Sequence, residues 1–188
     1  PLVIVNVSRG LAAPITLDPD HNDILAARDS GCLQLHCATC QEVIDAILIA
    51  YRVAEDPQVR LPVIVNLDGF SLSFTREPLV LPDSEAADRF LPAFRHGAGE
   101  PSAGHPSSKA VAVMGGSTYS YFRYETHLAA MAAIDIYGDA ARAFELEFGR
   151  HYPSIECYRN DDAEISFVMI GSFATKAKEA VDRLRDAG

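Results

Sequence analysis

The chain has 188 residues, of which 16 are Lys or Arg and 26 are Asp or Glu, so its formal net charge at pH 7 is −10. Such an acidic balance disfavours nucleic acid and anionic membrane surfaces as partners. The hydrophobic fraction of 48% is that of an ordinary globular protein. No apolar run approaches the length of a membrane span, and the first residues resemble a strand rather than a signal peptide, so we expect a cytoplasmic protein.

Two stretches with nearly the same pattern predict the centre of the fold. Residues 1–10 (PLVIVNVSRG) and 61–70 (LPVIVNLDGF) each carry a Val/Ile run followed by Asn and, a few residues later, by a Gly. Such runs are typical of strands covered on both faces in a parallel sheet. The long helical pattern between them favours a right-handed βαβ crossover. Because open parallel sheets bind ligands at the carboxyl ends of their strands, we expect the functional residues near Arg9 and Asp68.

The residues between these strands predict a turn, a second strand and a buried helix. Residues 18–23 (DPDHND) could form a metal-binding loop, but a turn that leads into a short helix is the favoured interpretation. Residues 31–36 predict a strand, and Thr39 with Glu42 predicts a capping box at the start of a helix over residues 40–55. That helix is apolar on nearly every face, so we expect it to lie between its own sheet and another chain or domain.

A short capped helix and a long linker follow the second Val/Ile run. Asp83 is expected to cap a helix that ends near Phe90. Residues 91–120 are rich in Gly, Pro and Ser, which indicates a linker or an arm laid over a surface. We include the Tyr- and Ser-rich residues 116–124 in this connection.

The last part of the chain predicts one long helix and the start of a second α/β unit. The helix is expected from about Tyr124 to Phe148, with Gly149 as its C-terminal cap. Its apolar side chains recur at steps of three and four: Leu128, Met131, Ile134, Tyr137, Ala141, Phe144 and Phe148. Residues 165–170 predict a buried strand that leads through Gly and Ser into a final helix.

The cysteines allow two interpretations. Cys32, Cys37 and Cys40 have the C-x4-C-x2-C spacing of three ligands in plant-type iron–sulfur proteins, with Cys157 as a distant fourth. The favoured alternative is that they are small buried residues, because free Cys packs as a hydrophobe. The motifs G-x-S-x-G, Walker A, H-E-x-x-H and G-x-G-x-x-G after a strand are absent, which disfavours a self-contained hydrolase or nucleotide-dependent enzyme.

Short motifs spread in order over nearly the whole chain resemble those of one family: Arg9-Gly10-Leu11-Ala12-Ala13-Pro14, Asp20-His21, Arg28-Asp29-Ser30-Gly31, Gln41-Glu42, Leu61-Pro62-Val63, Asp68-Gly69-Phe70, Phe90-Leu91-Pro92, Phe122-Arg123-Tyr124, Phe148-Gly149-Arg150, Asp162-Ala163-Glu164 and Gly171-Ser172. They are similar to the α-subunit region of the pyruvate:ferredoxin (2-oxoacid:ferredoxin) oxidoreductases. The resemblance implies an α/β fold with a parallel sheet and flanking helices, of the type that holds the pyrimidine ring of thiamine diphosphate. Residues 1–92 would be the later part of that domain, residues 93–155 a linker and long helix, and residues 156–188 the first βα unit of a transketolase-C-terminal-like domain.

The resemblance also implies an activity, a site residue and partners. The activity is oxidative decarboxylation of a 2-oxo acid to acyl-CoA, with electrons passed to ferredoxin, and the 188 residues alone should be inactive. Arg9 would pair with the substrate carboxylate, a role that suits a planar guanidinium; alternatively Arg9 pairs with an acidic loop residue such as Asp18. Thiamine diphosphate and Mg²⁺ would sit at an interface completed by another subunit, with none held by this chain alone. Iron–sulfur clusters would lie in partner subunits or domains, and the partners would be β-, γ- and δ-type subunits, coenzyme A and ferredoxin.

Departures from the family pattern leave alternatives open. Cys32 stands where an aromatic residue is common, and Phe74 replaces a frequent His. An added phenyl ring near the substrate would suit a bulkier aryl or branched 2-oxo acid in place of pyruvate. A non-catalytic assembly remnant of such a complex is a further alternative, because the apolar helix over residues 40–55 requires a partner surface in either case. An iron–sulfur carrier is the third.

Overall fold

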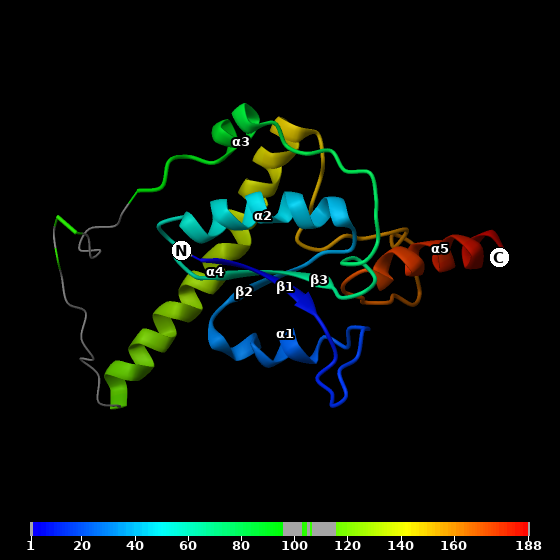
Figure 1. Cartoon of the computed structure of the whole chain (residues 1–188), viewed down its shortest axis with the longest axis horizontal. Coiled ribbons are helices and arrows are strands. Elements are labelled where there is room, and N and C mark those ends of the chain that lie inside the picture. Colours follow the sequence, from blue (N-terminus) through cyan, green and yellow to red (C-terminus); the bar gives the residue numbers. More distant parts are fainter. Residues whose placement is uncertain (1, 96–102, 105, 107–115, 188) are drawn as a thin grey trace.

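A computed structural model of the chain describes residues 2–95, 103–104, 106 and 116–187 (Figure 1). Its strands form one three-stranded parallel sheet, in the spatial order β1 (Val3–Ser8), β3 (Val63–Asp68) and β2 (Leu33–His36). The helices are α1 (Asn22–Ala26), the 3-10 turn η1 (Arg28–Ser30), α2 (Cys40–Glu55), α3 (Ser84–Phe90), α4 (Gly116–Phe148) and α5 (Phe173–Asp186). The predicted α/β class with a parallel sheet and flanking helices is confirmed at this level. Within the described ranges, none of the helices combines the length and the apolar character needed to cross a membrane.

The two strands with the Val/Ile runs differ in how far they are covered. In the central strand β3, Val63, Ile64, Val65 and Asn66 are all buried. In β1 at the edge of the described sheet, by contrast, Val5 is 47% exposed. The expectation of a strand covered on both faces therefore holds for β3 and is wrong for β1, where Ile4 and Val5, which point to opposite faces, are 39% and 47% exposed. The connection between them also contains β2, which pairs with the other side of β3.

Helix α2 begins at the predicted capping box and is buried from two sides. Thr39 Oγ1 accepts a hydrogen bond from the Glu42 N–H at 3.1 Å, and Glu42 Oε2 accepts one from the Ala38 N–H at 2.6 Å. One face of α2 packs on the sheet through small residues that include Ala50. The opposite face packs on α4 around Phe144. The second covering surface is thus another helix of the same chain, which corrects the expectation of a different chain or domain.

Helices α3 and α4 confirm one local prediction and correct another. Asp83 Oδ2 accepts hydrogen bonds from two backbone N–H groups in the first turn of α3, as expected of its cap. Helix α4 begins at Gly116 and not at the predicted Tyr124. No Gly or Pro lies between Gly116 and Tyr124 to stop the helix, and Tyr, Ser and Thr carry only moderate helix penalties. Most of the linker predicted over residues 91–120 lies outside the described residues.

Only the later half of α4 belongs to the core. Ala133, Ala140, Ala141 and Phe144 are buried, whereas Leu128, Met131 and Ile134 of the predicted stripe are each about half exposed. The first turns of α4 extend beyond the sheet at the lower left of Figure 1, which explains this difference. The end of the helix is as predicted: Gly149 has φ +70°, and its N–H donates to the Glu145 carbonyl at 2.7 Å.

A buried carboxylate in α2 receives the chain that follows α4. The side chain of Asp45 is fully buried and accepts two hydrogen bonds from the Arg150 guanidinium, at 2.6 and 2.9 Å. The Tyr152 hydroxyl donates to the same carboxylate at 2.7 Å, and Gln41 Nε2 lies 3.2 Å from both of its oxygens. The contacts from Arg150 and Tyr152 join residues more than one hundred positions apart in the sequence, and no local pattern indicated them.

Residues 165–170 are not a strand in the structure. They carry no strand hydrogen bonds to other described residues, and Ile165, Phe167 and Val168 are 80%, 73% and 97% exposed. A strand needs a neighbour for its backbone groups, and the described residues supply none at this place. The prediction of a buried strand is therefore wrong for this chain, while the helix predicted after it is present as α5.

Candidate functional site

The carboxyl ends of the strands bring together the two residues that the sequence indicated. Ser8 at the end of β1 and Asp68 at the end of β3 are register partners, so Arg9 and Asp68 lie at the same edge of the sheet. The arrow of β1 points toward the side where α5 lies (Figure 1). Two hydrogen-bonded carboxylates organise this edge.

Asp68 joins three distant segments. Its side chain is fully buried; Oδ1 lies 2.8 Å from His21 Nε2, and Oδ2 accepts from the N–H and the hydroxyl of Ser172, both at 2.7 Å. Burial alone raises the pKa of this carboxyl, but the hydrogen bonds from Ser172 and His21 outweigh it and hold the pKa below its usual value. The residue before Ser172 must be Gly: Gly171 has φ +72°, and a Cβ there would lie 2.6 and 2.7 Å from the Asp68 carboxylate oxygens.

Asp23 organises the end of β1. It comes from α1 and accepts hydrogen bonds from the Ser8 hydroxyl at 2.8 Å, the Asn6 side-chain amide at 3.1 Å and the Arg9 backbone N–H at 3.2 Å. Burial alone raises the pKa of Asp23, but these bonds and one from the N–H of Ile24 lower it below the ordinary value. The sequence placed Asp23 in a turn with acidic neighbours and gave no sign of this role. The metal-loop alternative for residues 18–23 finds no support: Asp20 accepts from the backbone and side chain of Asn22, as in a turn.

Asn66 connects these carboxylates to a histidine at the end of β2. The Asn6 amide donates to Asn66 Oδ1 at 2.7 Å, and Asn66 Nδ2 lies 3.4 Å from His36 Nδ1. The rings of His36 and His21 meet edge to face, with centroids 6.1 Å apart. Burial, together with the nearby His21, lowers the pKa of His36, so the ring is held in its neutral form to lower pH than usual.

Arg9 lies half-buried at this edge, against Gly69. A Cβ on Gly69 would lie 2.3 Å from the Ser8 carbonyl oxygen and 2.7 Å from Arg9 Nε, so a larger residue would displace the arginine. Among the described residues, the Arg9 guanidinium makes no hydrogen bond or ion pair, and the alternative pairing with Asp18 is not observed. Asp18 instead accepts from the Gly10 N–H through its backbone carbonyl at 3.1 Å.

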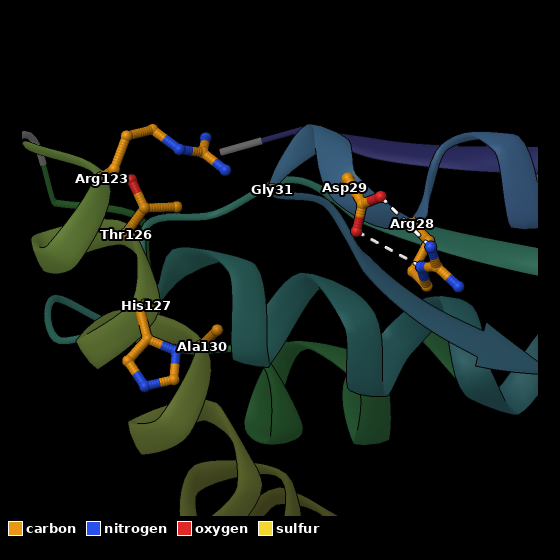
Figure 2. Close-up of a pocket in the computed structure, with 7 residues that line it drawn as sticks. All are labelled: Arg28, Asp29, Gly31, Arg123, Thr126, His127 and Ala130. Atoms are coloured by element: carbon orange, nitrogen blue, oxygen red, sulfur yellow. Dashed lines mark hydrogen bonds and ion pairs between the residues drawn. The ribbon is translucent and has the colours of Figure 1, made fainter. Parts of the chain in front are cut away.

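The larger of two cavities reaches this edge, whereas the smaller lies near the amino end of β2. The larger, about 790 Å³, lies between β2, α2 and α4 on one side and residues 152–185 on the other, and it reaches the hydrogen-bonded network at His36 and Gly171. Figure 2 shows the smaller, about 240 Å³, where Arg123 and Thr126 of α4 face η1. Two of its charges compensate each other, because the Arg28 guanidinium donates to both oxygens of Asp29, at 3.3 and 3.2 Å. Arg28 and, more weakly, Arg123 lower the pKa of Asp29. The edge that holds Arg9 is the stronger candidate, because it lies at the carboxyl ends of parallel strands.

The cysteines do not form a metal site. Cys37 is buried, the Cys40 thiol donates to the Leu72 carbonyl at 3.4 Å, and all of the cysteines are free. Burial raises the pKa of Cys37 and so disfavours the thiolate that a metal needs. No group of three or more His, Cys, Asp or Glu side chains in the described part of the chain is arranged to hold a metal ion. The iron–sulfur interpretation is not supported.

The fold and this edge define an α/β protein of the class that binds small ligands at the carboxyl ends of parallel strands. Comparison with known proteins then gives the family. Residues 1–141 match the family model described as "Pyruvate flavodoxin/ferredoxin oxidoreductase, thiamine diP-bdg", so the chain belongs to the thiamine diphosphate-binding family of pyruvate flavodoxin/ferredoxin oxidoreductases. The resemblance noted in the sequence is confirmed.

Curated relatives match over the whole chain. It is 38% identical to pyruvate synthase subunit PorA of Methanothermobacter thermautotrophicus and 40% identical to that of Pyrococcus abyssi, covering 49% and 47% of them. It is 32% identical to the α subunit of the NADH-dependent phenylglyoxylate dehydrogenase of Aromatoleum evansii, covering 47% of it. The chain thus spans about half the length of the curated relatives it matches.

The described residues do not by themselves fit the whole cofactor that the family name implies. A diphosphate bound through a metal ion requires oxygen ligands for that metal, and the described residues contain no group of three or more His, Cys, Asp or Glu side chains placed to hold one. Several donors at the sheet edge are already used within the network, whereas the Arg9 guanidinium has no hydrogen-bond partner among the described residues. A guanidinium with no partner is chemically suited to pair with a carboxylate.

Proposed function

We propose that this chain contributes the substrate-carboxylate site to the α subunit of a 2-oxoacid:ferredoxin oxidoreductase. The overall reaction would convert a 2-oxo acid and coenzyme A to acyl-CoA and carbon dioxide, with the released electrons taken up by ferredoxin. Family membership supports the class of enzyme. The position of Arg9 is the observation that carries the role of this chain.

Arg9 has the properties expected of a carboxylate-binding residue. It follows the last residue of β1 at the edge where parallel sheets bind ligands, and it is half-buried without an acidic partner among the described residues. A guanidinium binds a carboxylate through two parallel charge-assisted hydrogen bonds, which are stronger than neutral ones. The neighbouring carboxylates of Asp23 and Asp68 are occupied by other donors, so they leave the guanidinium available.

The proposal extends to the organisation of the whole protein. Residues 1–92 would belong to the domain that receives the thiamine pyrimidine ring, residues 93–155 to a linker and long helix, and residues 156–188 to the start of a transketolase-C-terminal-like domain. The binding site for thiamine diphosphate and Mg²⁺ would be completed by another subunit. Iron–sulfur clusters would lie in partner subunits or domains. Other Por-type subunits and ferredoxin would be the partners.

The test is steady-state kinetics of the complete complex with Arg9→Ala and Arg9→Lys. Removing a bidentate partner of a substrate carboxylate costs about 2–5 kcal/mol, so kcat/KM for the 2-oxo acid should fall by roughly thirtyfold or more in Arg9→Ala. Lys at this position keeps the charge without the planar fork and should recover part of the loss. Arg28→Ala is the matched control, because Arg28 is exposed and already paired with Asp29. Unchanged kcat/KM in Arg9→Ala would refute the role, and a wild-type complex that assembles without turnover would favour the non-catalytic remnant.

A bulkier 2-oxo acid is the second candidate, because an aromatic pair begins directly after Gly69, which Arg9 contacts. Phe70 follows the Gly69 on which Arg9 rests, and its ring stacks on Phe74 with centroids 5.8 Å apart and an interplanar angle of 25°. Phe74 is 77% exposed and so has apolar area left to cover. A relative that is named as a phenylglyoxylate dehydrogenase supports this choice. The complex should then prefer phenylglyoxylate to pyruvate, and Phe74→His should reduce that preference; faster turnover of pyruvate in wild type would exclude it.

A further inference from the structure

The carboxylate of Asp23 is fully engaged at the end of β1. Oδ1 accepts from the Ser8 hydroxyl at 2.8 Å and from the N–H of Ile24 at 2.7 Å. Oδ2 accepts from the Asn6 amide at 3.1 Å and from the backbone N–H of Arg9 at 3.2 Å. None of these four donors is charged, so the Asp23 carboxylate is stabilised by hydrogen bonds from neutral groups alone. Through these bonds Asp23 holds the end of β1 and the backbone of Arg9 to α1.

The side chain of Arg9 is limited by a second contact, on Gly69. Arg9 Nε and Cδ would be 2.7 and 3.0 Å from a Cβ on Gly69, which means that the stem of the arginine lies directly on that backbone. The Gly69 N–H donates to the Ser8 carbonyl at 2.9 Å, so the surface under the arginine is itself tied to the end of β1. Asp23 therefore fixes where the arginine begins, and Gly69 limits where its stem can lie.

We propose that Asp23 is the positioning residue for Arg9 and sets the place at which the guanidinium meets the substrate carboxylate. The inference rests on the proposed function of Arg9. A binding group held by its surroundings loses less freedom on binding and presents its donors in one geometry, which improves both affinity and orientation. Asp23 itself makes no contact with substrate in this proposal and acts only through Arg9.

A carboxylate is needed at this position because both of its oxygens accept. The amide of Asn has one oxygen and one NH₂ group, and either orientation would turn that NH₂ toward two of the present donors. Asp23→Asn therefore keeps the volume of the side chain and loses the hydrogen bonds on one side. Asp83→Asn is the matched control, because Asp83 also accepts from backbone N–H groups at the start of a helix but caps α3.

The experiment measures the complete complex with Asp23→Asn. The KM for the 2-oxo acid and the inhibition constant of oxamate, a 2-oxo acid isostere, should both rise about tenfold, because a binding group is misplaced. The KM for coenzyme A and the assembly of the complex should stay as in wild type, and Asp83→Asn should change none of these values. If Asp23→Asn does not assemble, Ser8→Ala replaces it, since it removes one donor to the carboxylate and should raise the same constants about threefold.

The double variant Arg9→Ala with Asp23→Asn separates positioning from general stability. If Asp23 acts through Arg9, the double variant should bind oxamate as weakly as Arg9→Ala alone. If the double variant instead raised the oxamate inhibition constant by the product of the two single fold-changes, the residues would act independently and the inference would be overturned. It would also be overturned if Arg9→Ala raised the KM for the 2-oxo acid and Asp23→Asn left it unchanged. An unchanged KM in Arg9→Ala would overturn the proposed function first, and this inference with it.

Discussion

The buried ion pair between Asp45 and Arg150 allows a quantitative prediction for the stability of the fold. Arg150→Ala removes the two charge-assisted hydrogen bonds, at 2.6 and 2.9 Å, from a carboxylate with no exposed area. Breaking one partner out of a buried pair costs about 3–5 kcal/mol, because the other charge is left without compensation. Tyr152 and Gln41 still donate to Asp45, which places the expected loss of unfolding free energy at the lower end, about 3 kcal/mol.

The measurement is equilibrium unfolding in urea, followed by far-UV circular dichroism, with Arg142→Ala as the matched control. Arg142 pairs with Asp139 on the surface of α4, and both side chains are well exposed, so its removal should leave the unfolding midpoint almost unchanged. The double variant Asp45→Leu with Arg150→Met removes both charges and should regain at least half of the lost stability. If Arg150→Ala were no more destabilising than Arg142→Ala, the buried carboxylate would not depend on Arg150 and the reasoning would be refuted.

Three further predictions concern the network at the sheet edge. The pKa of Asp68 is lowered below 3.8, so its hydrogen bonds stabilise the fold at neutral pH, and that contribution is lost as the pH falls from about 3.8 through the folded pKa. In urea unfolding measured at a series of acidic pH values, Asp68→Asn should therefore lose less stability than wild type as the pH falls. An equal loss in both proteins would contradict this prediction. The pKa of His36 is lowered below 6.5, so below that pH the unfolded chain binds a proton first and the stability of the fold decreases. The urea midpoint of wild type should therefore fall between pH 7 and pH 5, and it should fall less in His36→Gln. A wild-type midpoint that does not change, or an equal change in both proteins, would exclude this. Gly171→Ala should destabilise the protein more than Gly149→Ala. Both positions have φ near +70°, but only at Gly171 would the added Cβ meet the Asp68 carboxylate. Equal decreases in the thermal unfolding midpoint would show that this close approach has no effect.

Much of the local structure was predictable because its causes lie within a few residues of each other. The Val/Ile run of β3 predicts a buried strand, and the capping box of Thr39 and Glu42 fixes the start of α2 by hydrogen bonds that span at most four positions. The cap of Asp83 and the left-handed conformation of Gly149 are local in the same sense. The placement of Arg9 at the edge of the sheet followed from the rule that parallel strands end together.

The tertiary structure alone decided which polar groups meet at that edge. Asp68 and Ser172 are 104 positions apart, and Asp45 and Arg150 are 105 apart, so no repeat or motif links them in the sequence. It also decided that β1 and residues 165–170 remain exposed in this chain, although their apolar patterns resemble that of β3. An apolar run sets the tendency to form a strand, but the neighbours that would pair with it and cover it are supplied by distant parts of a fold. For the same reason the hydrogen bonds of Asp23 with Ser8 and Arg9 depend on how α1 lies against the end of β1.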